Sequence, residues 1–239
     1  MKYITLFEQQ TAFDNAKSTL DKPNMSLVTE TGNVYSLTEG GGVTYEYVDL
    51  GLPSRLKWAK CNVGASSETD YGGYFMWGST RPNKAYECTW TYAPFNNGVN
   101  SYNSSYFESV KDSVCPNGVL AKEYDTATQI MGGDWRMPTK DELKELIDNT
   151  VNEWDTINGV DGWKFTHKTD TSKYIFIPAT GYYLGGSVTN VGLNGGVWSS
   201  SLDTSSPDGA WYLGFNSGRC YMGNDYGRCY GQCVRGVRK

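Results

Sequence analysis

The chain has 239 residues, of which 38% are hydrophobic, 14% aromatic and 20% charged, and its formal net charge is -5. An acidic chain has no positive field to gather phosphates, which argues against nucleic acid as a partner. No apolar run approaches the roughly 20 residues of a membrane span, so we expect no membrane insertion. The 28 glycines and 18 tyrosines favour a strand-rich, loop-rich domain over a helical bundle.

Residues 1–42 predict a leader separate from the main domain at 43–239. Three glycines at 40–42 are typical of a hinge. The alternative is an unstructured chain end. We expect the leader to serve assembly or attachment to a virion. At least one strand is predicted here from four apolar residues, namely Val28, Val34, Tyr35 and Leu37.

The main domain is predicted to begin with a hairpin. The run EYVDLGLPSRLKWAKCNVGA contains a strand, a Gly-Pro turn and a second strand through Leu56, Trp58 and Cys61. Residues 66–118 are rich in Ser, Asn, Gly, Tyr and Pro. We therefore expect long surface loops there, with short strands such as GYFMWG.

Two helices are predicted next. The run AKEYDTATQIMGG places Tyr124, Ala127 and Ile130 or Met131 on one side and stops at two glycines. The second helix begins after Thr139, whose pairing with Glu142 forms a capping box. Its predicted buried stripe is Leu143, Leu146 and Ile147.

Between these helices, GDWRMP contains Trp135 and Arg136. The pair could be taken for a ligand site. An aromatic ring and an arginine at a helix corner ordinarily lock the corner, with the guanidinium bonding free carbonyls. We interpret both residues as structural.

Five strands are expected after the helices. They are KFTHK, YIFIPATGYY, GGVWSSS, GAWYLGFN and GQCVRGV, separated by Gly, Asn and Ser turns. Strands, two helices and then strands indicate an α+β domain of antiparallel sheets with long loops.

The segment from about 198 to 239 has the composition of a binding surface. Side chains alternate along an extended chain, so AWYLGF predicts one packed face and one displayed face. Beyond residue 218, RCYMGNDYGRCYGQC has few aliphatic side chains to bury and resembles a binding loop. The packed face comprises Trp211, Leu213 and Phe215, and the displayed face comprises Tyr212, Gly214 and Asn216.

Several motifs in order carry a family resemblance. The succession of EYVDLGLPS, LKWAKCNVG, DYGGYFMWG, GGDWRMPTKDELKELI, IFIPATGY, VWSSS, AWYLGF and RCYGQCVRGVR spans roughly residues 45–239. It resembles the C-type-lectin-like fold, in the branch that includes formylglycine-generating enzymes and the variable proteins of diversity-generating retroelements. The leader resembles amino-terminal segments of bacteriophage virion proteins.

The likeness to retroelement variable proteins implies which residues bind ligand. In those proteins, adenine mutagenesis converts AAC codons into codons for Asn, Tyr, Asp, Gly, Cys, Ser and Arg. The implied ligand-binding positions are Tyr212, Gly214, Cys220, Gly223, Asn224, Asp225, Tyr226, Gly227, Cys229 and Tyr230. We expect Arg228 and Arg235 to be internal and structural. With them, the implied scaffold is Trp211, Leu213, Phe215, Gly231 and Val234. Cys233 and Gly236 stand where Ser and Pro are usual.

Six cysteines occur without a CxxC or Cys/His metal spacing. The start MKYITLFEQQTAFDNAK lacks the apolar stretch of a signal peptide, so we expect mostly reduced thiols. Formylglycine-generating enzymes bind copper through two active-site cysteines. Here Cys229 and Cys233 would lie roughly 13 Å apart along a strand, and we interpret them as products of codon change. The others are Cys61, Cys88, Cys115 and Cys220.

Other chemical readings are weaker. Calcium-dependent sugar binding relies on Glu-Pro-Asn or Gln-Pro-Asp, and neither occurs. Loop carboxylates such as Asp203, Asp208 and Asp225 are ordinarily solvated. His167 has no evident nucleophile to activate. The serines 199–201 lack the glycines of a nucleophile elbow, and we interpret them as hydrogen-bonding supports beneath the displayed face.

The composition of residues 198–239 predicts a non-catalytic binding protein. The resemblance implies that it binds a receptor through a hypervariable surface, is encoded by a phage and is diversified by a retroelement. No cofactor or metal is expected. The expected partner is a cell-surface protein or glycan, bound by a homotrimer on the virion, with the cytoplasm of the producing cell as its location before assembly. The alternatives are an oxidase of the formylglycine-generating type and a fixed structural virion protein.

Overall fold

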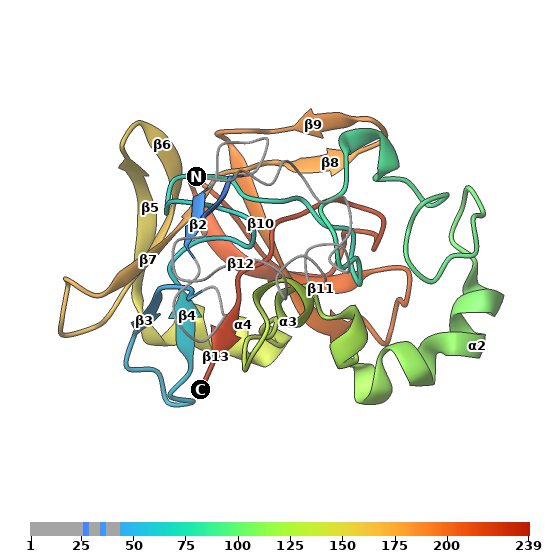
Figure 1. Cartoon of the computed structure of the whole chain (residues 1–239), viewed down its shortest axis with the longest axis horizontal. Helices are drawn as coiled ribbons and strands as arrows, with labels where there is room; N and C mark the ends of the chain where they lie inside the picture. Colours follow the sequence, from blue (N-terminus) through green and yellow to red (C-terminus); the bar gives the residue numbers. More distant parts are fainter. Residues whose placement is uncertain (1–25, 29–33, 37–43) are drawn as a thin grey trace. The chain divides into compact units, whose positions relative to one another are not determined.

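The computed structural model describes residues 26–28, 34–36 and 44–239 (Figure 1). The chain divides into a unit of Met1–Tyr45 and a unit of Glu46–Lys239. In the first, β1 (Ser26–Val28) pairs antiparallel with β2 (Val34–Ser36), which confirms the strand character predicted there. Leu37, the glycine hinge and most of the segment assigned to assembly lie outside the described residues. No helix in the described ranges is long and apolar enough to cross a membrane.

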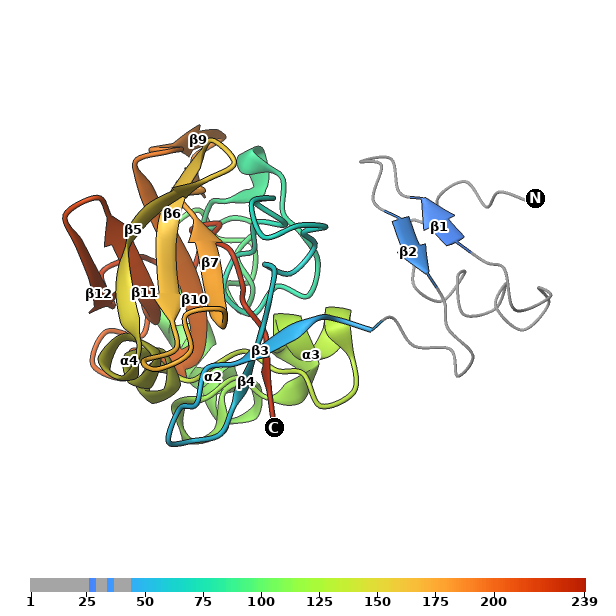
Figure 2. The ribbon, with the colours of Figure 1, turned by 90° about the vertical axis from the view of Figure 1, so that its left-hand side faces the viewer.

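The second unit is built from antiparallel sheets. Two three-stranded sheets, β5-β6-β7 and β10-β11-β12, lie against each other (Figure 2). A third sheet has the order β13-β4-β3, and a hairpin pairs β8 with β9. The bounds are β3 (Tyr47–Asp49), β4 (Lys57–Ala59), β5 (Val151–Ile157), β6 (Val160–Thr166), β7 (Tyr174–Pro178), β8 (Tyr182–Leu184), β9 (Ser187–Thr189), β10 (Asn194–Leu202), β11 (Ala210–Asn216), β12 (Arg219–Gly223) and β13 (Val237–Arg238).

Three α-helices accompany the sheets in the described part of the chain. They are α2 (Ser104–Val114), α3 (Thr126–Met131) and α4 (Lys140–Asn149), with 3-10 turns at Ala85–Glu87, Pro116–Gly118 and Lys122–Tyr124. The predicted α+β class with mostly antiparallel sheets is confirmed. The hairpin predicted at the start of the main domain is β3 and β4.

The main core lies between the two large sheets and α4. Phe165 of β6, Ile177 of β7 and Leu213 of β11 contribute buried side chains to one cluster, together with Leu143 and Leu146 of α4. These apolar faces leave water together, which is the dominant stabilising term of the fold. The core therefore holds β11 firmly from one side.

The α4 helix begins where the capping box predicted. The Thr139 hydroxyl accepts from the Glu142 amide at 3.3 Å, and the Glu142 carboxylate accepts from the Thr139 amide at 2.8 Å. The Arg136 guanidinium donates to the Met137 carbonyl and to both Glu142 oxygens. The structural interpretation of Arg136 and of buried Trp135 is thereby confirmed.

The α3 helix is shorter than predicted at its start. Asp125 accepts from the Thr128 amide at 2.8 Å, so the α-helix begins only at Thr126 and the residues before it form a 3-10 turn. Gly132, at φ +69, ends the helix as predicted.

Four local predictions are wrong. RCYMG, expected to belong to a binding loop, is strand β12, which pairs with β11. GYFMWG is no strand, because Phe75 makes only an isolated bridge with Gln232. The α2 helix stands where a loop was expected, with Phe107 and Val114 as its buried residues. The expected strand GQCVRGV is an extended segment in which only Val237 joins a sheet. Bridges to residues distant in sequence set the backbone of GYFMWG and GQCVRGV, whereas α2 begins at a local cap, in which Asn103 Oδ1 accepts from the Tyr106 amide.

Candidate ligand-binding surface

Arg235 anchors the carboxy-terminal segment inside the protein. It is fully buried and donates to the carbonyls of Ala59, Lys60 and Phe176 and to the Asn62 side chain. Burial lowers its pKa to about 10, so the guanidinium stays charged at neutral pH. A buried charge with this many partners ties the carboxy-terminal segment to two other parts of the chain, residues 59–62 and Phe176 of β7.

Arg228 is also fully buried, but mostly among aromatic rings. Its guanidinium lies 3.9 Å from the Phe107 ring centroid and 5.6 Å from that of Tyr102. Its Nε donates to the Pro207 carbonyl at 2.8 Å. The prediction that Arg228 and Arg235 are internal is confirmed.

Strand β10 supports the segment through its serines. Ser199 Oγ donates to the Trp211 carbonyl at 2.7 Å, and Ser200 Oγ donates to the Pro138 carbonyl. Ser201 Oγ accepts from the Lys140 amide. The serines are buried hydrogen-bonding supports, as predicted. With Trp198, Arg228 and residues 231–237, which are all buried, they form what we call the buried frame.

The predicted faces of β11 need correction. Leu213 and Phe215 pack into the core as expected. Trp211 is only half-buried, under the ammonium of Lys140 at 4.9 Å from its ring centroid. Tyr212 is not displayed, because only 1% of its surface is exposed.

Two glycines explain why Tyr212 is buried. A Cβ at Gly214 would lie 2.8 Å from the Tyr212 ring, and a Cβ at Gly223 would lie 2.6 Å from it. Both glycines are buried themselves. The two glycines leave a hollow on the face of the sheet that points away from the main core, and the Tyr212 phenol ring fills this hollow.

Tyr212 is the base of a stack of phenol rings. Its ring lies 4.7 Å from that of Tyr226 with 1° between the planes, and Tyr226 lies 4.9 Å from Tyr230 with 10° between them. Tyr182 of β8 lies 5.0 Å and 5.6 Å from the last two rings. These four residues form what we call the tyrosine cluster. Sequence reasoning missed Tyr182, whose one signal was its place in the expected strand YIFIPATGYY.

The ten positions predicted to bind ligand divide by exposure. Asp225 is exposed, whereas four others are buried and cannot touch a ligand in this conformation. The predicted display of those four is wrong. They are Tyr212, Gly214, Gly223 and Cys229; the half-buried positions are Cys220, Asn224, Tyr226, Gly227 and Tyr230.

Strand β12 turns different residues outward than predicted. Cys220 and Met222 pack against the main core, and burial raises the pKa of Cys220 to about 12. The opposite face presents Tyr221 and Arg219, whose guanidinium lies 4.6 Å from the Tyr221 ring centroid. Alternation within RCYMG could have identified both. The binding surface thus comprises Tyr182, Arg219, Tyr221, Asn224, Asp225, Tyr226 and Tyr230.

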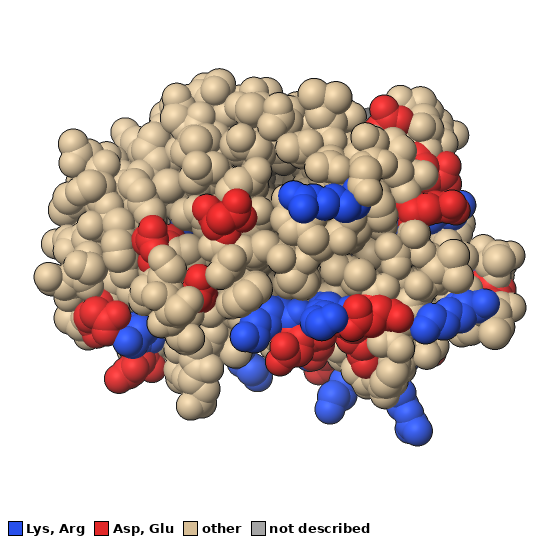
Figure 3. Space-filling model, turned by 180° about the vertical axis from the view of Figure 1, so that it is seen from behind, with Lys and Arg blue, Asp and Glu red and all other residues tan. Residues whose placement is uncertain are grey.

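The charge on the rear of the molecule is mixed. Acidic and basic side chains interleave along its lower edge, while the upper part is largely uncharged (Figure 3). No continuous basic patch crosses this face.

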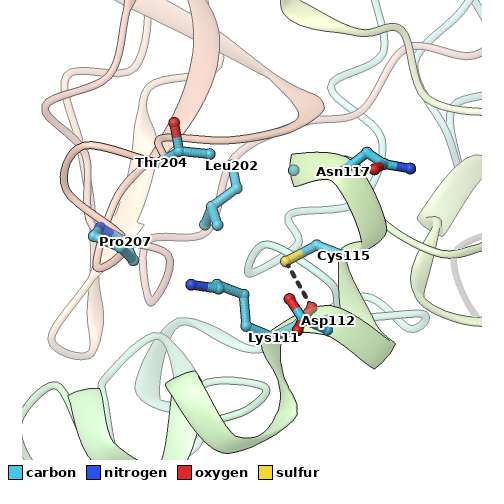
Figure 4. Close-up of a pocket in the computed structure, with 8 residues that line it drawn as sticks. Lys111, Asp112, Cys115, Asn117, Leu202, Thr204 and Pro207 are labelled. Atoms are coloured by element: carbon cyan, nitrogen blue, oxygen red, sulfur yellow. Dashed lines mark hydrogen bonds between the residues drawn. The ribbon is translucent and has the colours of Figure 1, made fainter.

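A pocket of about 260 Å³ lies elsewhere, between the end of α2 and the loop after β10 (Figure 4). Its lining includes Lys111, Cys115 and Leu202. The Cys115 thiol donates to the Lys111 carbonyl, and burial raises its pKa to about 11. This thiol is protonated at neutral pH and is a poor nucleophile. None of the ten predicted positions lines this pocket.

The residues weighed for metal or acid-base chemistry have local partners. Each of the three aspartates accepts a hydrogen bond from a nearby side chain. The donors are Asn224 for Asp203, Ser206 for Asp208 and Tyr212 for Asp225. Within the part of the chain that the structure describes, no group of three or more His, Cys, Asp or Glu could hold a metal ion. His167 Nδ1 accepts from two backbone amides of its own turn.

The two cysteines compared with a copper pair have separate surroundings. Cys229 packs with Met76 and Cys88, while the Cys233 thiol donates to the Tyr71 carbonyl and contacts the Thr180 hydroxyl. Burial raises the pKa of each thiol to about 11. All six cysteines are free in the structure.

Comparison with known proteins identifies the family. A family model, the Lcl C-terminal domain, matches residues 52–235. The chain belongs to this family. The match confirms the resemblance to C-type-lectin-like variable proteins that the sequence motifs indicated, and the family is consistent with a variable ligand-binding protein. No curated protein and no solved structure gives a match.

Proposed function

We propose that the chain is a non-catalytic receptor-binding protein of C-type-lectin-like fold whose contact surface is the one defined above. One observation carries this proposal. The exposed and half-buried side chains of residues 219–230 are mainly Tyr, Asn, Asp and Gly, while every residue from 231 to 237 is buried. Substitutions can therefore change the binding surface without changing the buried frame that supports it.

The chemistry of this surface suits recognition of a macromolecule. Tyrosine offers a large amphipathic contact area at low cost in conformational entropy, and Asn and Asp add hydrogen bonds. The stacked rings of Tyr212, Tyr226 and Tyr230 already support one another, so less order has to be imposed when a ligand binds.

The proposal also concerns the origin of the gene and of its variable codons. The residue types on the surface are those that mutated AAC codons encode, which supports diversification by a retroelement in a phage. The protein would act on the virion against a cell-surface protein or glycan, as a homotrimer whose copies raise the avidity. Sequencing around the gene tests this origin. A near-identical template with AAC at the varied codons is expected, and a genome without one would contradict it.

Oxidase chemistry is not favoured by the two thiols. Copper binding and cysteine activation both use the thiolate, whereas the pKa of Cys229 and of Cys233 is raised to about 11. We expect no copper uptake by the purified chain. Stoichiometric copper that is lost in Cys229→Ser and in Cys233→Ser would support the enzyme alternative.

Binding of fluorescently labelled protein to a panel of intact bacterial cells tests the function. Saturable binding to at least one strain is expected. A combined variant with Tyr182, Asp225, Tyr226 and Tyr230 replaced by Ser should lose it. The lost ring contacts and the lost bond to Tyr212 lower Tm, but the variant should still unfold in one cooperative thermal transition above room temperature.

The matched control replaces tyrosines away from the binding surface. Tyr47 of β3 and Tyr86 of the first 3-10 turn are 49% and 57% exposed, and their change to Ser should leave cell binding intact. The proposal fails if the combined variant binds like the native protein, or if it unfolds.

A further inference from the structure

The binding surface contains one carboxylate that has no cationic partner. Asp225 is exposed and lies two residues after the end of β12. The ion pairs among residues 44–239 involve other acids, such as Glu87 with Arg81 and Asp155 with Lys164. An unpaired carboxylate on a surface made for contact is available to a ligand.

A buried hydroxyl fixes the orientation of this carboxylate. The Tyr212 phenol donates to Asp225 Oδ1 at 2.6 Å. Burial, and then the bond to Asp225, raise the pKa of Tyr212 far above its ordinary value. The phenol therefore keeps its proton and donates throughout the neutral range, and Oδ2 is left for another partner.

Aromatic rings surround the carboxylate. Tyr212, which bonds Asp225, stacks on half-buried Tyr226, and Tyr182 and Tyr230 lie beside that ring. The charge of Asp225 contributes to the raised pKa of both Tyr226 and Tyr230, after burial as the largest cause. The electrostatic potential at these rings is therefore made more negative by a neighbouring anion.

Phenol rings beside a carboxylate favour a cation. Cations are attracted to the negative face of an aromatic ring, most strongly where water is partly excluded. The protein uses this chemistry internally, with Arg228 over Phe107 and Arg219 over Tyr221. Neither guanidinium is paired with Asp225.

We propose that Asp225 and the tyrosine cluster receive an arginine or lysine side chain of a protein target. The inference rests on the proposed function and names the chemistry that the surface selects. The guanidinium or ammonium group pairs with Asp225 Oδ2 while its aliphatic stem packs on the tyrosine rings. The net charge of -5 assists the approach of a basic partner.

The test is selection from a random dodecapeptide library displayed on beads, with the native protein as bait. Peptides retained by the native protein should be enriched in Arg and Lys. Synthetic versions should bind Asp225→Asn about tenfold more weakly than native protein, because one charge pair is lost. Raising the salt concentration should narrow that difference.

The matched control is Asp141→Asn. Asp141 is exposed in the first turn of α4 and has the same charge, so its loss reports the effect of net charge alone. Binding within about twofold of native is expected. Equal weakening in both variants would contradict the inference, as would retained peptides no richer in Arg and Lys than the input, or no retained peptides.

Cell binding separates this inference from the proposed function. Suppose that the combined serine variant fails to bind cells while Asp225→Asn binds them like the native protein. The surface would then be the binding site, but the basic side chain would not be its target, and the inference would be overturned. Unchanged cell binding by the combined variant would instead overturn the proposed function.

Discussion

Arg235 and two members of the tyrosine cluster, Tyr226 and Tyr230, lie in the same carboxy-terminal segment and are held in different ways. The arginine is fully buried, whereas the two rings are half-buried. Arg235 bonds to carbonyls of Ala59 and Phe176, which are far from it in sequence. Tyr226 and Tyr230 contact Tyr182 and each other. A change at the arginine disturbs several elements at once, whereas a change among the surface rings stays local. A short segment can thus contain both a fixed support and a replaceable surface.

The largest expected effect on stability comes from a change in the buried frame, at Arg235. Arg235→Ala removes the donor of several buried hydrogen bonds and leaves carbonyls without partners, which should lower the free energy of unfolding by about 3–5 kcal/mol. Urea denaturation measures it. Arg219→Ala, at an exposed position, should stay within about 0.5 kcal/mol. A loss below about 1 kcal/mol at Arg235 would contradict its role.

The hollow beneath the surface is tested by Gly214→Ala. The new methyl group would lie 2.8 Å from the Tyr212 ring and 2.9 Å from that of Tyr221, so we expect a loss of about 1–3 kcal/mol from overpacking. Gly218→Ala is the control, because its nearest neighbour would be 3.4 Å away. Equal stability of the two variants would show that Tyr212 does not need the hollow.

Tyr212→Phe tests whether the buried Tyr212 hydroxyl anchors residues 224–230. It removes the bond to Asp225 but keeps the ring, so we expect a cost of about 1 kcal/mol and faster amide hydrogen exchange in residues 224–230. Tyr74→Phe removes a comparable buried bond, to the Thr180 carbonyl. Its effect on exchange should be confined to the neighbourhood of β8. Unchanged exchange in Tyr212→Phe would contradict the anchoring of the loop.

The smallest effect is expected on the outward face of β12. Tyr221→Ser should cost about 1 kcal/mol or less, since the half-buried ring contacts the guanidinium of exposed Arg219 and meets the Tyr212 ring at an angle, with 6.4 Å between the ring centroids. Met222→Ser, on the adjacent position that packs against the core, should cost more. Thermal melting of both variants compares them. A more damaging change at Tyr221 would reverse the faces assigned to this strand.

Local patterns in the sequence predicted those parts of the fold that depend on neighbouring residues. The capping box of Thr139 and Glu142 and the stop at Gly132 are decided within one turn of helix. Arg228 and Arg235 were predicted to be internal through the family resemblance, and they are. The α+β class followed from the order of the elements.

The surface itself was only partly predictable. Alternation placed Tyr212 outward. The register of β11 with β12, however, sets Gly223 opposite Tyr212 and Gly214 opposite Tyr221, and the hollow that the two glycines leave draws the Tyr212 ring inward. Tyr182 reaches the cluster from β8. The burial of Tyr212 and the contact made by Tyr182 cannot be predicted from the sequence of one strand, because each depends on the pairing or packing of separate strands.

The central claim is that, within residues 210–237, the residues of the buried frame and those of the binding surface are different residues with separate roles. A saturation scan of this segment, with resistance of the displayed protein to protease as the measure of folding, tests it most directly. We predict broad tolerance at Arg219, Tyr221, Asn224, Asp225 and Tyr230 and intolerance at Arg228, Cys233, Val234 and Arg235. Equal sensitivity of the two sets would contradict the account.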